Sequence, residues 1–334
     1  MSRTGFNWKR WLKPAFAIVA FAFLMAAVAR TVRDIRTVPT FAPGWLLLAA
    51  LLYATHYAVQ AVGWHLILRG LGQPVRLSDS VRIWYGTLVA RWIPGPLVYS
   101  AARLVMAREA GLSVTAVAFG VILELSYILL GAMVTTVVFA SGLIPTLMAS
   151  PTGKSLTVTG LIALAVGGVT ALRPATLLGF CRIPLFRKAV RKIAGEDLPD
   201  HGLPVMSTPY SLCLLAYYTV FWILSGVMFG VLARSFLPMT PERWAVCIPT
   251  FGASWLAGFL AFLTPAGIGI REGVMWLMLG RVLSKSDGLI LAVLSRLMMM
   301  TVELLSVLVV RATMHRGVQA TRSVPVPLAV RSME

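Results

Sequence analysis

Charged residues are scarce in this sequence of 334 residues, and acidic residues are the scarcest. Only 13% of the residues are charged, with 12 Asp and Glu against 30 Lys and Arg, whereas 58% are hydrophobic. Soluble domains carry about 25% charged residues, and no stretch here is long and polar enough to form one. The composition therefore indicates one polytopic α-helical membrane domain, because several apolar runs reach the roughly 20 residues that cross a bilayer.

Cysteine and histidine are also rare, which argues against metal, disulfide and cofactor chemistry. Three scattered cysteines form neither a disulfide framework nor a CxxC pair, and the four histidines show no HExxH spacing. A GxxxxGK[ST] phosphate loop is absent as well. We expect no metal, no cofactor and no catalytic residues. The net charge of +18 is assigned to cytoplasmic loops rather than to nucleic-acid binding, because no folded basic module is present.

Eight apolar runs follow one another along the chain, and two of them are interrupted. The first run can be retained as a span or removed as a signal peptide, since Ala27–Ala29 is similar to a signal-peptidase site. The runs are Pro14–Ala29, Gly44–Leu68, Ile83–Ala107, Val114–Ala140, Leu156–Leu172, Tyr210–Ala233, Trp244–Leu283 and Leu289–Val310.

The distribution of Lys and Arg sets the orientation of these runs. Loop 173–208 carries six basic residues and loop 141–155 carries one, which places the former in the cytoplasm with both termini. The interrupted runs must then enter and leave the bilayer on one side. This predicts six full spans and two opposed re-entrant hairpins in an inverted repeat, with eight or so full spans as the alternative.

These elements predict one transmembrane domain over residues 1–312. Its inverted halves cover about 10–140 and 156–312, and residues 313–334 form a flexible cytoplasmic tail. Segment 182–199 is interpreted either as an interfacial helix on anionic lipid or as a solvated basic loop.

The interruptions "RWIPGPLVYSAAR" (91–103) and "FLTPAGIGIREGV" (262–274) are the candidate binding site. Proline and glycine leave unpaired backbone groups, which membranes tolerate only where they are buried in protein or line a wet cavity. A helix that restarts after a break presents a partly positive N-terminus, which suits a lipid phosphate. The candidate substrate-binding residues are Pro94, Gly95 and Arg103 in the first break, and Pro265, Gly267, Gly269, Arg271 and Glu272 in the second.

A second group of charges lies inside apolar runs and predicts a buried network. Its members are Arg91, Glu124, Arg296 and Glu303. A charge at the bilayer centre costs about 2.5–3.5 kcal/mol on insertion scales, so it is expected to have a partner. Aligning "VILELSYILLG" (121–131) with "VLSRLMMMTVE" (293–303) puts Glu124 opposite Arg296, and we expect these two to pair. Glu303 lies two turns beyond Arg296 on the same face.

The two interruptions resemble the lysylphosphatidylglycerol synthase transmembrane-region family, also called flippase-like membrane proteins. The family pattern is a Pro–Gly break followed by Arg, then Pro-x-Gly-x-Gly-x-x-Glu, then an Arg in the last span. Pro94, Gly95 and Arg103 fit the first part. Pro265, Gly267, Gly269, Glu272 and Arg296 fit the rest, and the likeness covers about residues 10–312. Pro96 departs from the pattern, which expects a smaller or more flexible residue there.

The resemblance implies translocation of a phospholipid or a polyprenyl-phosphate-linked head group. The fused synthases of this family carry a soluble aminoacyltransferase domain after the membrane region, and none follows here, so the translocating half is expected without the lysyl-lipid substrate. Two alternatives remain: an integral-membrane transferase on a lipid-linked substrate, and a non-catalytic partner of a separately encoded lipid-modifying or glycosyl transferase. The lipid, the direction, the energy coupling and the oligomeric state are left open.

Overall fold

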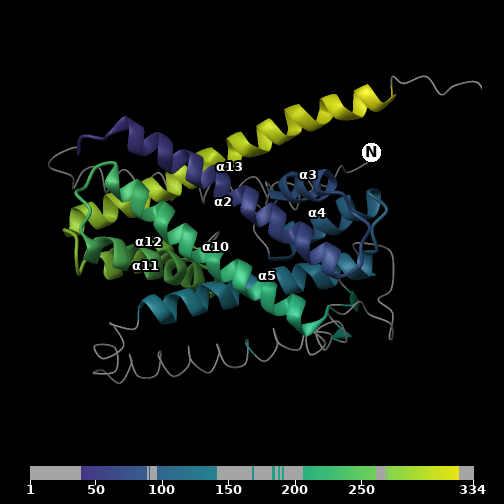
Figure 1. Cartoon of the computed structure of the whole chain (residues 1–334), viewed down its shortest axis with the longest axis horizontal. Coiled ribbons are helices and arrows are strands. Elements are labelled where there is room, and N and C mark those ends of the chain that lie inside the picture. The colour runs from purple at the N-terminus through teal and green to yellow at the C-terminus, as the bar shows by residue number, and fades with distance from the viewer. Residues whose placement is uncertain are drawn as a thin grey trace, which may run out of the picture.

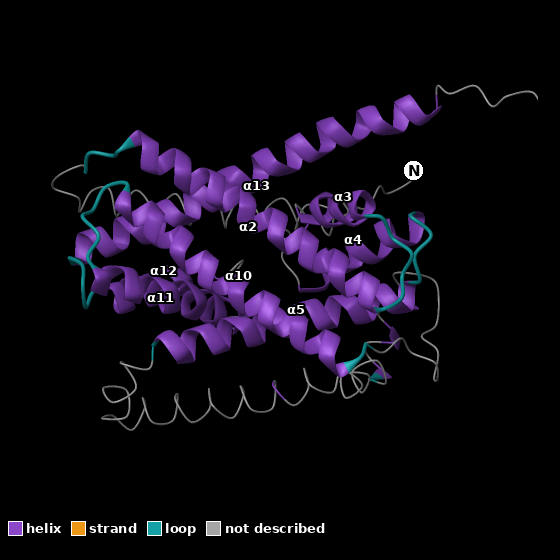
Figure 2. Ribbon diagram, in the orientation of Figure 1, coloured by secondary structure: helices purple, strands orange, loops and turns teal. Residues whose placement is uncertain are grey.

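The described part of the chain consists of helices and the loops between them in the computed structural model, with no strand among these residues (Figures 1 and 2). It comprises residues 39–88, 90, 96–140, 168, 183–184, 187–188, 190–191, 206–260, 267 and 269–322. The helices within it are α2 (Pro43–Gly70), α3 (Leu77–Leu88), α4 (Pro96–Glu109), α5 (Val114–Phe139), α10 (Thr208–Arg234), α11 (Pro241–Leu260), α12 (Ile270–Leu279) and α13 (Lys285–Arg322).

Four of the described helices, α2, α5, α10 and α13, are long and apolar enough to cross a membrane. Their starts follow known capping rules: α2 and α10 have proline in the first turn, and the Ser113 hydroxyl accepts a hydrogen bond from the N–H of Ala116 at the start of α5. The four corresponding apolar runs are therefore confirmed as helices of a multi-pass membrane protein. The runs Pro14–Ala29 and Leu156–Leu172 lie outside the described residues, apart from Gly168.

The two interrupted runs each form a pair of shorter helices. α3 and α4 have 12 and 14 residues, and α12 has 10, which is about 15 Å at 1.5 Å per residue and far short of the ~30 Å hydrocarbon core. α11 has 20 residues but contains Pro249. α3 packs on α4, and α11 packs on α12. Each interruption therefore separates two neighbouring helices that touch each other.

α2 and α10 lie antiparallel along much of their length (Figure 1). The N–H of Ala42 donates to the carbonyl of Ser235 over 2.7 Å, joining the start of α2 to the end of α10. At the other end, the Tyr210 hydroxyl donates to the carbonyl of Leu66 over 2.8 Å. Between these ends, the Tyr217 hydroxyl donates to the carbonyl of Val59. Tyrosine hydroxyls on α10 thus bond to backbone carbonyls of α2.

The contacts between helices repeat between the two halves of the chain. If α2, α3, α4 and α5 are exchanged with α10, α11, α12 and α13 in that order, each pair of described helices in substantial contact maps onto another such pair. The packing of α5 on α11, for example, corresponds to that of α13 on α3. The α2–α10 contact maps onto itself.

Glycines allow the closest approaches between these helices. A Cβ at Gly131 of α5 would lie 2.7 Å from the backbone oxygen of Tyr218 in α10. Gly226 of α10 meets the backbone of Ile248 in α11 in the same way. In a membrane the hydrophobic effect does not drive helices together, so close van der Waals packing between small residues does so instead.

Several predicted features fall partly or wholly beyond the described residues. Of segment 182–199, only 183–184, 187–188 and 190–191 are described, and Val190 is buried. α13 continues past residue 312, where the predicted tail begins, as far as Arg322.

Candidate functional site

A buried cluster in the first half of the chain is centred on Arg103 and Glu124. Arg103 of α4 forms an ion pair with Glu124 of α5, and the other oxygen of that carboxylate accepts a hydrogen bond from the indole N–H of Trp84 over 3.1 Å. The Arg103 guanidinium lies 4.4 Å from the ring centre of Trp64 and 4.5 Å from that of Tyr99. Four helices, α2 to α5, therefore supply this cluster.

Burial and partners together determine what the Arg103 cluster can do. The Arg103 side chain is wholly buried and that of Glu124 nearly so. Two aromatic faces and a carboxylate offset the cost of burying the guanidinium. A planar guanidinium binds carboxylate and phosphate with the same fork geometry. In this conformation its anion is the protein's own carboxylate.

A second cluster surrounds the interruption in the other half. Gly267 and Gly269 have φ values of +69° and +86°, which side chains rarely tolerate, and α12 begins directly after them. One oxygen of Glu272 accepts a hydrogen bond from the N–H of Gly269 over 2.7 Å. The other oxygen lies 3.8 Å from the guanidinium of Arg296 in α13. Glu272 therefore caps its own helix and also joins it to α13.

Arg271 lies next to the contact between Gly267, in this interruption, and Gly258 of α11. A Cβ at Gly267 would lie 2.6 Å from the Cα of Gly258 and 3.1 Å from the Cγ of Arg271. The Arg271 guanidinium lies 6.0 Å from the ring centre of Phe251, and one of its nitrogens lies 4.0 Å from the sulfur of Met299. Arg271 and Glu272 are only partly buried, in contrast to Arg103.

Glu303 is buried on α13, two turns after Arg296, and bonds to a residue of the first half. The Tyr57 hydroxyl of α2 lies 3.0 Å from the Glu303 carboxylate and 3.2 Å from the carbonyl of Met299. A helix of the first half thus contributes a donor to a carboxylate of the second half.

The structure brings most of the predicted charges into these two clusters, but one expected pairing is wrong. Glu124 pairs with Arg103 rather than with Arg296, whose guanidinium lies 3.8 Å from the carboxylate of Glu272. The alignment of the two halves placed Glu124 and Arg296 at equivalent positions. Residues at equivalent positions lie in different halves, and here each half has its own cluster, so the two residues do not meet. Pro94, Gly95, Arg91 and Pro265 lie outside the described residues.

Aromatic residues around the charges were missed by sequence reasoning. Trp84, Trp64, Tyr99 and Tyr57 each contact a charged member of a cluster. Trp84 is 40 residues from Glu124, so no local spacing links the two. The only available signal was the presence of aromatic residues in runs that also border buried charges.

Comparison with known protein families shows which family this chain belongs to. The profile described as "Lysylphosphatidylglycerol synthase TM region" matches residues 10–306. The chain belongs to this family. Among curated proteins, no similar sequence was found.

The family match includes every described member of both clusters, up to Glu303 near its end. Membership agrees with the helical membrane architecture and connects the protein with lipid modification in membranes. Lipid is therefore the expected class of ligand for a member of the lysylphosphatidylglycerol synthase transmembrane-region family.

Proposed function

We propose that this protein translocates a lipid with an anionic head group, a phospholipid or a polyprenyl-phosphate-linked one, across the bacterial inner membrane. The observation that carries the proposal is that each half contributes one arginine–carboxylate cluster beside an interrupted run, within a family named for a lipid synthase. Buried ionisable groups in membrane helices commonly mark substrate pathways.

The inverted repeat with two opposed hairpins belongs to this proposal. It is supported by the exchange of contacts between the halves and by the antiparallel course of α2 and α10, which occupy equivalent places in them. Paired interrupted helices in inverted halves are typical of transporters that rock around a site near the midplane. Both termini then lie in the cytoplasm.

We propose that the lipid binds by exchange of the anion that is paired with an arginine. A lipid phosphate takes the place of Glu124 on Arg103, or of Glu272 beside Arg296, and the displaced carboxylate keeps its second donor. Trp84 holds Glu124, and the Gly269 N–H holds Glu272. Exchange of one anion for another avoids leaving a guanidinium uncompensated, which would cost several kcal/mol. The half-helix N-terminus at Ile270 adds partial positive charge.

The two clusters differ in accessibility, which suggests which one receives lipid in this conformation. Arg103 is sealed, whereas the Glu272 side chain is 15% exposed and lies 3.8 Å from its arginine. The second cluster is thus the more open one, and rocking of the halves would reverse the difference.

A reconstituted translocation assay tests this function. Proteoliposomes are loaded with fluorescent phospholipids or a short polyprenyl-phosphate sugar, and wild type is compared with Arg103→Gln, Glu272→Gln and the control Lys285→Gln. Lys285 is an exposed cation at the start of α13. We expect one lipid class to move, and both site variants to lose that movement while the control retains it. Equal movement in all four proteins would contradict the proposal.

A second candidate function is a membrane partner for a separately encoded lipid synthase or glycosyl transferase. It is favoured by the family description, which refers to the membrane region of a synthase. In that case Arg103→Gln and Glu272→Gln would leave function intact in cells, and co-purification of an enzyme with the tagged protein would persist in both variants.

A further inference from the structure

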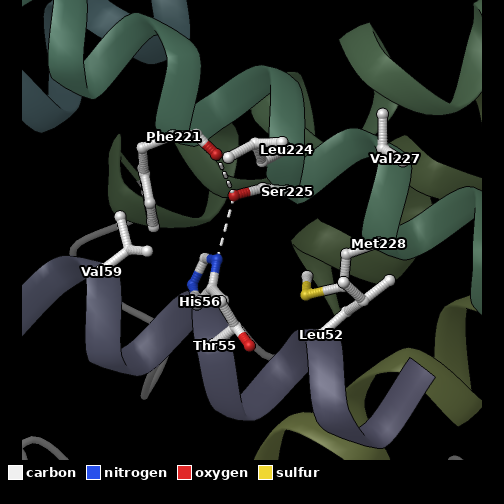
Figure 3. Close-up of a pocket in the computed structure, with 9 residues that line it drawn as sticks. All are labelled: Leu52, Thr55, His56, Val59, Phe221, Leu224, Ser225, Val227 and Met228. Atoms are coloured by element: carbon white, nitrogen blue, oxygen red, sulfur yellow. Dashed lines mark hydrogen bonds between the residues drawn. The ribbon is translucent and has the colours of Figure 1, made fainter. Parts of the chain in front are cut away.

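A groove between α2 and α10 lies apart from both charged clusters. It has a volume of about 140 Å³ and is lined by residues between 52 and 59 on α2 and between 221 and 228 on α10 (Figure 3). Its walls are mainly apolar: Leu52 and Val59 on one side, and Phe221, Val227 and Met228 on the other. An apolar cavity of similar size stays free of water and accepts hydrocarbon.

The two hydroxyls among the residues that line the groove are bonded within the protein. The Ser225 hydroxyl donates to the carbonyl of Phe221 over 2.7 Å, and His56 Nδ1 lies 2.9 Å from the same hydroxyl oxygen (Figure 3). A hydroxyl has one hydrogen, so Nδ1 of His56 is the donor in this contact. The Thr55 hydroxyl donates to the carbonyl of Leu51. The groove accordingly presents mainly carbon to an occupant.

The groove lies halfway along α2, a helix long and apolar enough to cross a membrane. His56 is at the midpoint of α2, whose 28 residues run from Pro43 to Gly70. Eight residues of a helix rise about 10 Å, roughly a third of the hydrocarbon core. Both walls belong to membrane-crossing helices, and Leu224 on the rim is 53% exposed. If α2 crosses the bilayer symmetrically about its midpoint, the medium outside the groove is lipid chain.

The groove also lies where the two halves meet. The α2–α10 contact is the one that maps onto itself when the halves are exchanged. A lipid whose head group passes between the halves must keep its chains in hydrocarbon, so it needs a lateral apolar opening between them. Because the α2–α10 contact is shared equally by the two halves, an opening there is equivalent for both. It can therefore serve a head group that faces either leaflet.

We propose that the α2–α10 groove holds an acyl chain of the phospholipid whose head group is being translocated. The inference rests on the proposed function and adds the place where the chain leaves the protein. A phospholipid chain is chosen over an isoprenoid because the family is named for a phospholipid synthase. The hydrophobic effect does not favour the groove over the bilayer, because the bilayer interior is equally apolar. The acyl chain must therefore be held by complementary shape and dispersion contacts.

Photolabelling of the full-length protein in proteoliposomes tests the groove. The probes are phosphatidylglycerol with a diazirine near the middle of one acyl chain and, separately, a polyprenyl phosphate with a diazirine in its chain. Labelled positions are read by mass spectrometry, and labelling at 52–59 and 221–228 is compared with that at 304–309. The latter stretch of α13 includes the exposed side chains Leu304, Leu305, Leu308 and Val309, so it reports ordinary contact with bilayer lipid.

Three variants separate filling of the groove from a general effect of bulk. Val227→Phe fills it from α10, and Val59→Phe fills it from α2. Val220→Phe is the matched control, since Val220 is 53% exposed on α10, two turns before Val227, and does not line the groove. Thermal unfolding in detergent shows whether each variant is folded, and the variant from the opposite wall serves if one is not.

We expect the acyl probe to label the groove several-fold more than 304–309 in wild type and in Val220→Phe. Both groove-filling variants should lose this excess, and lipid translocation should fall several-fold with it. Equal labelling of groove and α13, preference for the isoprenoid probe, or unchanged translocation in the filled variants would each overturn the inference. The proposed function can fail separately: a wild type that labels in the groove but moves no lipid would contradict translocation itself.

Discussion

Arg103 is the most constrained charge among the described residues. It is enclosed by two aromatic rings and paired with a carboxylate, and it has no exposed surface. Such a residue contributes to stability, so loss of function on its replacement is not by itself proof of a binding role. A test at the residue scale must separate the two roles.

Replacing both members of the Arg103–Glu124 pair provides that separation. Arg103→Gln or Glu124→Gln alone should cost about 3–5 kcal/mol of stability, because each leaves a buried charge without its partner. The double variant Arg103→Met/Glu124→Leu should recover most of that loss while lipid translocation stays abolished. Thermal unfolding in detergent and the proteoliposome assay give the two readouts. A double variant that translocates lipid would mean that the pair is purely structural.

Trp84 tests the second donor to Glu124. Trp84→Phe keeps a buried aromatic ring but removes the N–H that bonds the carboxylate over 3.1 Å. Loss of a hydrogen bond to a charged group should cost about 1.5–3 kcal/mol. Trp276→Phe, on an exposed side chain of α12, is the control and should change stability little in the same unfolding measurement. Equal effects of the two substitutions would show that the hydrogen bond contributes nothing specific.

At the scale of elements, the interruption before α12 depends on glycine for two reasons. Gly267 has a positive φ, and its Cα face lies against Gly258 of α11. Either reason alone would favour glycine. A side chain at position 267 would therefore both strain the backbone and collide with α11.

Two glycines with similar backbone angles distinguish strain from crowding. Gly72 has a φ of +73° with open space around it, whereas a Cβ at Gly267 would lie 2.6 Å from the Cα of Gly258. Gly72→Ala should cost only the conformational strain, about 1–2 kcal/mol. Gly267→Ala should cost clearly more and should also reduce lipid translocation. The unfolding midpoints of the two variants test this, and equal midpoints would contradict the close approach of α11.

For the whole molecule, the proposed inverted repeat predicts a topology that labelling can check. α2 and α10 run antiparallel, so the segments that follow them belong on opposite sides of the membrane. Ser78, after α2, and Thr240, after α10, are both exposed. In a background with Cys181, Cys213 and Cys247 replaced, Ser78→Cys should react with a membrane-impermeant maleimide only from the cytoplasmic side.

Thr240→Cys should react only from the opposite side, and both variants should retain translocation. Labelling of intact cells and of inverted vesicles gives the two directions of access. Reaction of both cysteines from the same side would exclude an inverted arrangement of the halves and would favour an architecture with an additional full span between them.

The membrane class, the four described spans, the positions of the interruptions and the identities of the buried charges could all be predicted from the sequence. These follow from local properties: the length of apolar runs, the conformational limits of proline and glycine, and the cost of charge in lipid. Which of these charges meet could not be predicted in this way and depends on the packing of the helices. Arg103 and Glu124 are on different helices, Tyr57 reaches Glu303 over 246 positions, and His56 meets Ser225 over 169. Such contacts depend on how helices cross, which one helix's own periodicity does not specify.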